Sequence, residues 1–306
     1  MNKSKNQRIP RKKKKEIKKQ LICDKQNHIV SSGAVLFRTP RKFSIPKNEE
    51  NVVNEDAALA RDKVLAVSDG AGGGGVFADR WSQTLLENLP TEPIATLEEM
   101  NRWMDGFADN FYAECEELAK EKGGLFLDKF YDEGSFATLS AVWRVSEKEC
   151  VWLQYGDSVA FCWNRDSGLL QSTISTLKEF DLPPFLINTI AEISGKALRT
   201  GRFLVEPNSA VFVASDAISH FLLMLYAVEN QEQLHYKEMI EQAMSAQTKT
   251  ANLVRAAIDE ELSFRFVMDN LLSNDLTESD KQEFLYYLER RGLLAHDDYS
   301  LAYACC

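Results

Sequence analysis

Three short apolar runs in the middle of the chain constrain its fold most strongly. They occupy residues 136–145, 150–155 and 160–164, and only a few residues separate one from the next. Runs of this length are typical of β-strands. Connections this short can join only antiparallel neighbours, because a parallel crossover needs about a dozen residues or more. The sequence therefore predicts an antiparallel meander at its centre.

Strands and long helices are segregated along the rest of the chain. Further strand-length runs occupy residues 31–38, 57–60, 64–68, 210–215 and 301–305. Apolar residues recur at helical spacing in residues 78–89, 96–118, 217–228 and 277–292. We expect a polar connection at residues 39–51, an irregular or partly helical insertion at residues 171–200, and a polar helical stretch at residues 230–272. Segregation of this kind favours an α+β layered domain over a parallel doubly wound sheet.

Composition fits a large globular domain. The chain has 306 residues, of which 44% are hydrophobic, and this is enough to bury a sizeable core. No run approaches about eighteen consecutive apolar residues, and no apolar stretch follows the N-terminal charges, so we expect neither a membrane span nor a secretory signal. The six cysteines form no CxxC pair, which favours a reducing, cytoplasmic location. The chain lacks a long exposed heptad pattern, so we expect a monomer.

Charge divides the chain into a basic tail, residues 1–27, and an acidic domain, residues 28–306. Residues 1–20 carry ten Lys and Arg residues against one acid, Glu16, although the whole chain has a net charge of −10. An acidic body argues against nucleic acid as the main substrate. The basic segment 11–19 can be read as a solvated, disordered tail or as a docking element for RNA, an anionic membrane surface or an acidic partner.

Acidic residues stand at the ends of the predicted strands. Asp69 follows residues 64–68, Asp157 follows residues 150–155, and Asp216 follows the run that begins at residue 210. The pairs Glu55-Asp56 and Asp297-Asp298 precede two other strands. A single Asp often caps a turn. Five such positions at strand edges favour a shared site, because one sheet can bring distant strand ends together.

A cluster of carboxylates repels itself and requires compensation by positive charge. Oxygen ligands without nearby His or Cys suit Mg²⁺ or Mn²⁺ better than Zn²⁺. Two ions that share one carboxylate can lower the pKa of a bridging water and stabilise charge on a phosphoryl group under attack. Asp69 is the candidate for the shared carboxylate. Gly70 has no side chain, so its carbonyl can approach an ion.

Six short motifs occur in an order that resembles the PPM family, the type 2C metal-dependent serine/threonine protein phosphatases, in its bacterial form. They are Asn54-Glu55-Asp56-Ala57, Ser68-Asp69-Gly70-Ala71-Gly72-Gly73, Gly134-Ser135-Phe136-Ala137-Thr138, Gly156-Asp157-Ser158, Ser215-Asp216-Ala217 and Asp297-Asp298-Tyr299-Ser300. Each motif alone is a weak signal, whereas the ordered set is strong. The resemblance runs from about residue 31 to residue 306.

The resemblance implies a four-layer αββα sandwich of two antiparallel sheets flanked by helices, with the metals at one end of the sheets. It implies that Asp69 bridges two Mg²⁺ or Mn²⁺ ions and that Gly70 contributes a carbonyl. It further implies that Asp216 and Asp297 complete the first metal site and that Glu55 binds the second ion. Asp56 would hold metal-bound waters, and Asp157 would bind a third, weaker ion. The implied reaction is in-line attack of a metal-bound hydroxide on phosphoserine or phosphothreonine in a protein substrate, with Asp69 and Asp56 as the catalytic residues.

Four departures from the family pattern concern the surroundings of the metals. The Arg that holds the phosphate in most members is replaced by Asn51, and Lys47, Arg41 or Lys42 are the candidates to take over its role. Ala71 stands where many eukaryotic members have a His that serves as a proposed general acid; His296 is a weak alternative for that role. Ala217 replaces the usual Gly. The stretch between Asp157 and Asp216, which normally holds a flap, is short.

Three hypotheses follow. The first is an active Mg²⁺- or Mn²⁺-dependent phosphoprotein phosphatase. The second is a catalytically weak or inactive pseudophosphatase that acts as a regulatory or binding module, which the loss of the phosphate-holding Arg motivates. The third is an interaction protein whose basic tail docks it to RNA or to a membrane.

Overall fold

The computed structural model describes residues 35–306 except residues 51, 246–247 and 261. Leu36–Cys306 forms one compact unit. The predicted basic tail and the first half of the strand expected at residues 31–38 lie outside the described residues; in the second half only Arg38 belongs to a strand. Asn51 lies outside them as well.

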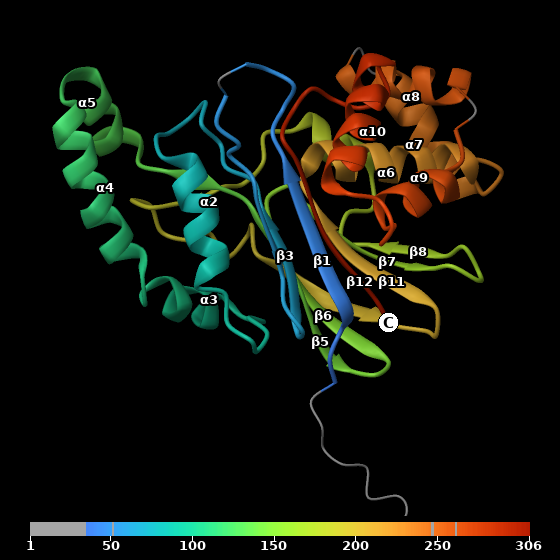
Figure 1. The fold of residues 1–306 in the computed structure, drawn as a ribbon, viewed down its shortest axis with the longest axis horizontal. Coiled ribbons are helices and arrows are strands. Elements are labelled where there is room, and N and C mark those ends of the chain that lie inside the picture. Colours follow the sequence, from blue (N-terminus) through green and yellow to red (C-terminus); the bar gives the residue numbers. More distant parts are fainter. Residues whose placement is uncertain (1–34, 51, 246–247, 261) are drawn as a thin grey trace, which may run out of the picture. The chain divides into compact units, whose positions relative to one another are not determined.

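Two five-stranded antiparallel sheets form the middle of this unit (Figure 1). In spatial order the first contains β1 (Arg38–Ile45), β12 (Tyr299–Cys305), β11 (Ser209–Ala214), β7 (Val159–Asn164) and β8 (Leu170–Ser172). The second contains β10 (Arg199–Leu204), β6 (Glu149–Tyr155), β5 (Leu139–Ser146), β3 (Val64–Ser68) and β2 (Ala57–Ala60). A small third sheet pairs β4 (Phe136–Ala137) with β9 (Ile187–Asn188).

Each large sheet has its own layer of helices (Figure 1). The second sheet is covered by α2 (Ala78–Glu87), α3 (Leu97–Met104), α4 (Ala108–Lys122) and α5 (Gly124–Glu133). The first is covered by α6 (Asp216–Glu229), α7 (Leu234–Ser245), α8 (Lys249–Glu260), α9 (Phe264–Leu271) and α10 (Glu278–Arg290). A short 3₁₀ helix, η1 (Leu177–Asp181), follows β8.

Alternation along the strands fills three separate cores. Leu65 and Val67 of β3 point into a central core, where they join Val211 and Val213 of β11. Ala66, between them, faces the helices on the outer side of its sheet. Successive side chains of a strand point to opposite faces of its sheet. Each sheet here has apolar side chains on both faces, so one face packs against the other sheet and the other face packs against helices. The four-layer αββα sandwich predicted from the sequence is therefore confirmed.

The first strand differs from the expectation. Residues 39–51 were expected to be a polar connection, but Arg38–Ile45 forms β1, which pairs only with β12 in the described structure. Pro40 lies in an irregular step of this pairing, between Arg38 and Arg41, and Thr39 has a φ of 48°. Proline and positive charge are both tolerated on an edge strand with one free side.

Helical and irregular segments also differ in detail. The single apolar stripe expected from residue 96 onward is divided by a break at residues 105–107 into α3 and α4. The stretch expected to be irregular or partly helical, residues 171–200, contains η1, as expected, but also the end of β8, β9 and the start of β10. Within the described ranges, no helix is both long and apolar enough to cross a membrane.

Candidate metal centre

Strand pairing gathers three of the predicted acids at one end of the second sheet. Ala57 of β2 pairs with Ser68 of β3, so Asp56 and Asp69 stand just beyond two neighbouring strands. Leu139 of β5 pairs with Tyr155 of β6, which places Asp157 at the same end.

The acids of the first sheet, Asp216 and Asp297, lie at the same end as the turn that contains Asp157. This turn leads from β6 into β7, and Val159 of β7 pairs with Ala214, two residues before Asp216. Ala214 also pairs with Leu301 of β12, the strand that follows Asp297. The two sheets therefore deliver Asp56, Asp69, Asp157, Asp216 and Asp297 to one region.

The pKa shifts of these carboxylates agree with this arrangement. Burial raises the pKa of Asp69 well above its ordinary value, and the negative charges of Asp56 and Asp216 raise it further. The pKa of Asp216 is likewise raised by burial and then by Asp157 and Asp297. Burial, reinforced by Asp298, raises the pKa of Asp56 to about 8. Proximity of several buried carboxylates therefore stabilises their protonated forms.

Thr138, in the Gly134–Thr138 motif, holds Asp69 in place. The amide of Asp69 donates to Thr138 Oγ1 at 3.1 Å, and the Thr138 amide donates to the Asp69 carbonyl at 2.8 Å. Thr138 Oγ1 also shares a hydrogen bond of 2.8 Å with Ser158 Oγ, one residue after Asp157. This motif therefore fixes the backbone of Asp69 and connects it to the turn of Asp157.

Two glycines allow the backbone to pack against Glu55. A Cβ on Gly70 would lie 2.6 Å from the Glu55 carbonyl oxygen, and one on Gly72 would lie 1.9 Å from Glu55 Oε1. The Gly72 amide donates to Glu55 Oε2 at 3.3 Å. Side chains at either position would displace Glu55, so the glycine-rich segment determines where this carboxylate lies.

Asp298 is a component whose role the sequence did not reveal. Its side chain is 4% exposed. Its carboxylate accepts the backbone amides of Lys47 and Glu55, each at 2.8 Å. The only signal in the sequence is its place next to Asp297, which does not distinguish a ligand from a structural acceptor.

Among the candidate phosphate-binding cations, Lys47 is the one whose charge acts on the acids. Burial raises the pKa values of Glu55 and Asp297, and the charge of Lys47 opposes that rise at both groups. Arg41 and Lys42 lie farther along β1: Arg41 donates to the Asn274 carbonyl at 3.4 Å, and Lys42 donates to the Ala58 carbonyl at 2.6 Å. The structure therefore does not bring these two side chains to the acids.

His296 is engaged by two carboxylates. Its ring nitrogens lie 2.6 Å from Glu289 Oε1 and 2.9 Å from Glu49 Oε1. Hydrogen bonds to both partners raise the pKa of His296. The imidazole is therefore held at the surface by Glu49 and Glu289.

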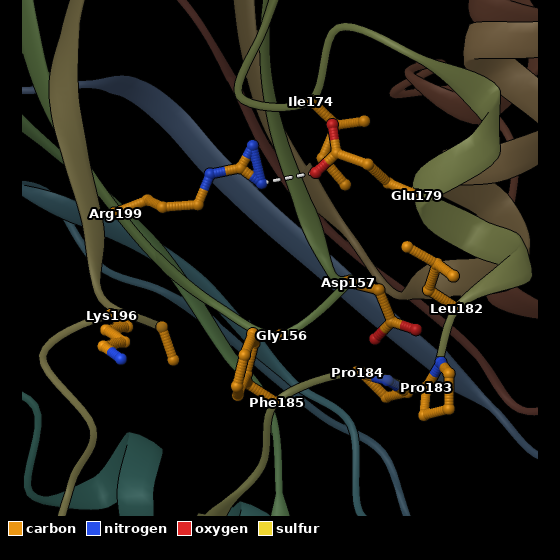
Figure 2. Close-up of a pocket in the computed structure, with 11 residues that line it drawn as sticks. Gly156, Asp157, Ile174, Glu179, Leu182, Pro183, Pro184, Phe185, Lys196 and Arg199 are labelled. Carbon is orange, nitrogen blue, oxygen red and sulfur yellow. Dashed lines mark hydrogen bonds and ion pairs between the residues drawn. The ribbon is translucent and has the colours of Figure 1, made fainter.

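A cavity of about 290 Å³ adjoins the acids at Asp157 (Figure 2). Leu182, Pro183 and Phe185 form an apolar wall, and the Asp157 carboxylate lies beside the first two (Figure 2). An ion pair of 2.6 Å between Arg199 and Glu179 joins β10 to η1 at its rim. The cavity is thus apolar on one side and charged on the other, and it opens next to a member of the acid cluster.

The donor chemistry fits hard divalent cations, although the side chains do not converge on one point. Asp56 Oδ2 is buried and has no hydrogen-bond partner within the described residues. In the same part of the chain, no group of three or more His, Cys, Asp or Glu side chains is arranged to hold a metal ion. The donor set is therefore suited to Mg²⁺ or Mn²⁺ in its chemistry.

Comparison with known proteins supports the fold. No family model and no curated protein matches the chain. The serine/threonine phosphatase Stp1 from Staphylococcus aureus is 14% identical, with a TM-score of 0.50, over 91% of this chain and 99% of that one. PstP/Ppp from Mycobacterium tuberculosis is 15% identical, with a TM-score of 0.49, over 88% and 98%. A PstP catalytic domain in complex with 2 manganese ions is 14% identical, with a TM-score of 0.48, over 88% and 98%.

At this level of identity the likeness establishes the fold. The chain has the fold of bacterial serine/threonine phosphatases. The resemblance to the PPM phosphatases is therefore confirmed in its architecture.

Proposed function

We propose that the protein is a Mg²⁺- or Mn²⁺-dependent phosphatase that hydrolyses phosphoserine or phosphothreonine in proteins. The observation that carries this proposal is the meeting of five buried or half-buried Asp residues from both sheets at one end of the sandwich. Two metal ions, with a weaker site for a third, would supply an activated water when bound and neutralise the charge of the phosphoryl group.

The residues of the chain take distinct parts in this proposal. Asp69 is the shared ligand, and Thr138 fixes its backbone, which restricts the positions that the carboxylate can take. Gly70 contributes its carbonyl, and Asp216 with Asp297 completes one metal site. Glu55 serves the other site, Asp56 orients water, and Asp157 is the ligand of the weaker third ion.

Lys47 is the proposed substitute for the missing phosphate-binding Arg. Its charge already acts on Glu55 and Asp297, whereas Arg41 hydrogen-bonds elsewhere. The cavity beside Asp157 is the proposed approach for a phosphoprotein segment, because its apolar wall can pack against residues that flank the phosphoamino acid. The described cysteines are free thiols, in keeping with the proposed cytoplasmic location.

The test is hydrolysis of a phosphoserine or phosphothreonine peptide with Mn²⁺ between about pH 7 and pH 9. We expect metal-dependent turnover by the wild-type protein. Asp69→Asn should lower it about a thousandfold or more, because it removes the shared ligand and with it several kcal/mol of transition-state stabilisation. Asp132→Asn, an exposed change on α5, is the control. Absence of metal-dependent turnover in the wild type, or full activity of Asp69→Asn, contradicts the proposal.

The alternative is a regulatory pseudophosphatase. It is favoured by the replacement of the phosphate-holding Arg by Asn51 and of the usual Gly by Ala217. Calorimetry with Mn²⁺ distinguishes the two. Metal binding without hydrolysis of any of several phosphopeptides supports the alternative, whereas binding with hydrolysis supports an enzyme.

A further inference from the structure

Asp298 joins two parts of the site that are eight residues apart in the chain. The loop of residues 46–56 leads from β1 to β2, and it contains both Lys47 and Glu55. The Lys47 amide donates to Asp298 Oδ1 and the Glu55 amide donates to Asp298 Oδ2, each at 2.8 Å. One carboxylate thus fastens both ends of this loop to the residue that follows Asp297.

A carboxylate is well suited to this task. Both of its oxygens accept hydrogen bonds, so two amides that point at one side chain can be satisfied together. An amide side chain of the same shape has only one accepting oxygen, and its NH₂ group would face the second N–H. With 4% of its surface exposed, Asp298 has little access to solvent that could replace either bond.

The rest of Glu55 is held equally firmly. Its carbonyl accepts the Gly70 amide at 3.2 Å and Ser82 Oγ at 2.6 Å. Its carboxylate accepts the Gly72 amide at 3.3 Å. The Glu55 amide donates to Asp298, and the Lys47 amide donates to the same carboxylate.

We propose that Asp298 is a positioning residue. By accepting the backbone amides of both Lys47 and Glu55, it fixes the position of the phosphate-binding Lys47 relative to the metal-binding Glu55. This inference rests on the proposed function for the roles of Lys47 and Glu55. The bridge itself is independent of that function.

The test uses the full chain with Asp298→Asn. Asp298→Asn removes none of the proposed metal ligands, yet we expect its Mn²⁺ dissociation constant, measured by calorimetry, to rise about tenfold, the effect of losing one charge-assisted hydrogen bond. In the metal-free proteins, hydrogen exchange of the Lys47 and Glu55 amides should be slow in the wild type and at least about tenfold faster in the variant.

Two controls separate positioning from charge and from general stability. Asp79→Asn removes a negative charge that also acts on Glu55 but accepts neither amide, so it tests the effect of charge alone. Asp280→Asn weakens the cap of α10, where Asp280 accepts from Thr277, so it tests destabilisation outside the site. Neither control should accelerate exchange of the Lys47 and Glu55 amides.

The outcomes distinguish this inference from the proposed function. Unchanged Mn²⁺ affinity and unchanged exchange in Asp298→Asn overturn the positioning role. Equal losses of affinity in Asp298→Asn and Asp79→Asn, without faster exchange, overturn it as well. A wild type that does not bind Mn²⁺ contradicts the proposed function, while the exchange data still decide on the bridge. If Asp298→Asn does not fold, the wild type decides: rapid exchange of the two amides overturns the bridge, and protection supports it.

Discussion

Gly72 lies directly against the carboxylate of Glu55. The Gly72 amide donates to Oε2, and a Cβ on Gly72 would lie 1.9 Å from Oε1. No real Cβ can occupy that space, so Gly72→Ala must displace the Glu55 side chain. We expect Mn²⁺ affinity to fall about tenfold or more, by loss of an oriented ligand. Calorimetry measures this.

The control for this prediction is the neighbouring glycine. A Cβ on Gly73 would meet no atom within 4 Å. Gly73→Ala should therefore bind Mn²⁺ like the wild type. Equal affinities of the two alanine variants would show that the contact between Gly72 and Glu55 has no role in metal binding.

Thr138→Val should destabilise the domain by about 1–3 kcal/mol, because the half-buried Asp69 amide loses its hydroxyl acceptor. Thr138 is 2% exposed, and valine keeps its shape. Chemical denaturation measures the change. Ser140→Ala is a matched control, since Ser140 Oγ is buried without a hydrogen-bond partner in the described structure, and its removal should cost little. A similar loss in both variants would argue against a specific role for Thr138.

Stability of the metal-free protein should fall as pH rises from about 4 to about 8. Burial and neighbouring acids raise the pKa of Asp56 from 3.8 to about 8, so in this range the folded state binds more protons than the unfolded state. Its contribution is fully present below the unfolded pKa and is lost as pH passes the folded pKa. Denaturant unfolding at several pH values checks the slope, and Asp56→Asn should make it shallower. An identical slope in the variant would rule out Asp56 as a cause.

Apparent Mn²⁺ affinity should change with pH in the opposite direction. Burial raises the pKa of Asp157 to about 6, so protons compete with metal for this side chain, and protonation of Asp56, whose pKa is raised to about 8, removes a negative charge beside the metals. Metal binding must release these protons. We expect affinity to increase between pH 6 and pH 8, with proton release detectable by calorimetry in buffers of different ionisation enthalpy. Affinity independent of pH would contradict this account.

Lys47→Met should raise KM for a phosphopeptide about tenfold, by loss of a charge-assisted contact with the phosphate. Its effect on Mn²⁺ should have the opposite sign, because removal of a positive charge near Glu55 and Asp297 favours cation binding. Steady-state kinetics and calorimetry provide the two readouts. Lys63→Met, which removes a surface pair with Glu92, should change neither. An unchanged KM would leave Lys47 without a role in phosphate binding.

The gathering of the acids could be predicted because strand ends in antiparallel sheets are local features. Asp69 and Asp157 follow apolar runs whose length and spacing are visible in the sequence. The same reasoning gave most strands, but the meander predicted over residues 136–164 was wrong: only β5 and β6 pair with each other, whereas β7 pairs with β11 in the other sheet and Phe136–Ala137 pairs with β9. Short turns do not reveal where the chain passes from one sheet to the next, and the four layers came from the resemblance to the PPM family. The individual roles of the acids stay predictions, since they depend on ions rather than on strand pairing.

Edge strands were harder to recognise. β1 carries Arg38, Arg41 and Lys42 and contains Pro40, so its composition is that of a loop. β10 contains Gly201, where a Cβ would lie 2.4 Å from the Trp152 ring. Each of these strands has only one hydrogen-bonded neighbour in its sheet, and tertiary pairing rather than local propensity makes it a strand.

Long-range hydrogen bonds were beyond the reach of the sequence. Asp298 accepts amides from residues 251 and 243 positions away. Nothing in the Asp297-Asp298 pair indicates which member turns toward the loop before β2. That choice depends on the pairing of β12 with β1, which places Ser300 opposite Ser44.

Asp69 and Asp216 are carried by different sheets, and the central core lies between those sheets. Leu65 and Val67 on one side meet Val211 and Val213 on the other. The separation of the two halves of the acid cluster is therefore set by the volume of apolar side chains that are not among the proposed ligands. A substitution that changes the volume of this core changes the distance between the two sheets. The spacing of the proposed ligands can therefore be altered without replacing any acid.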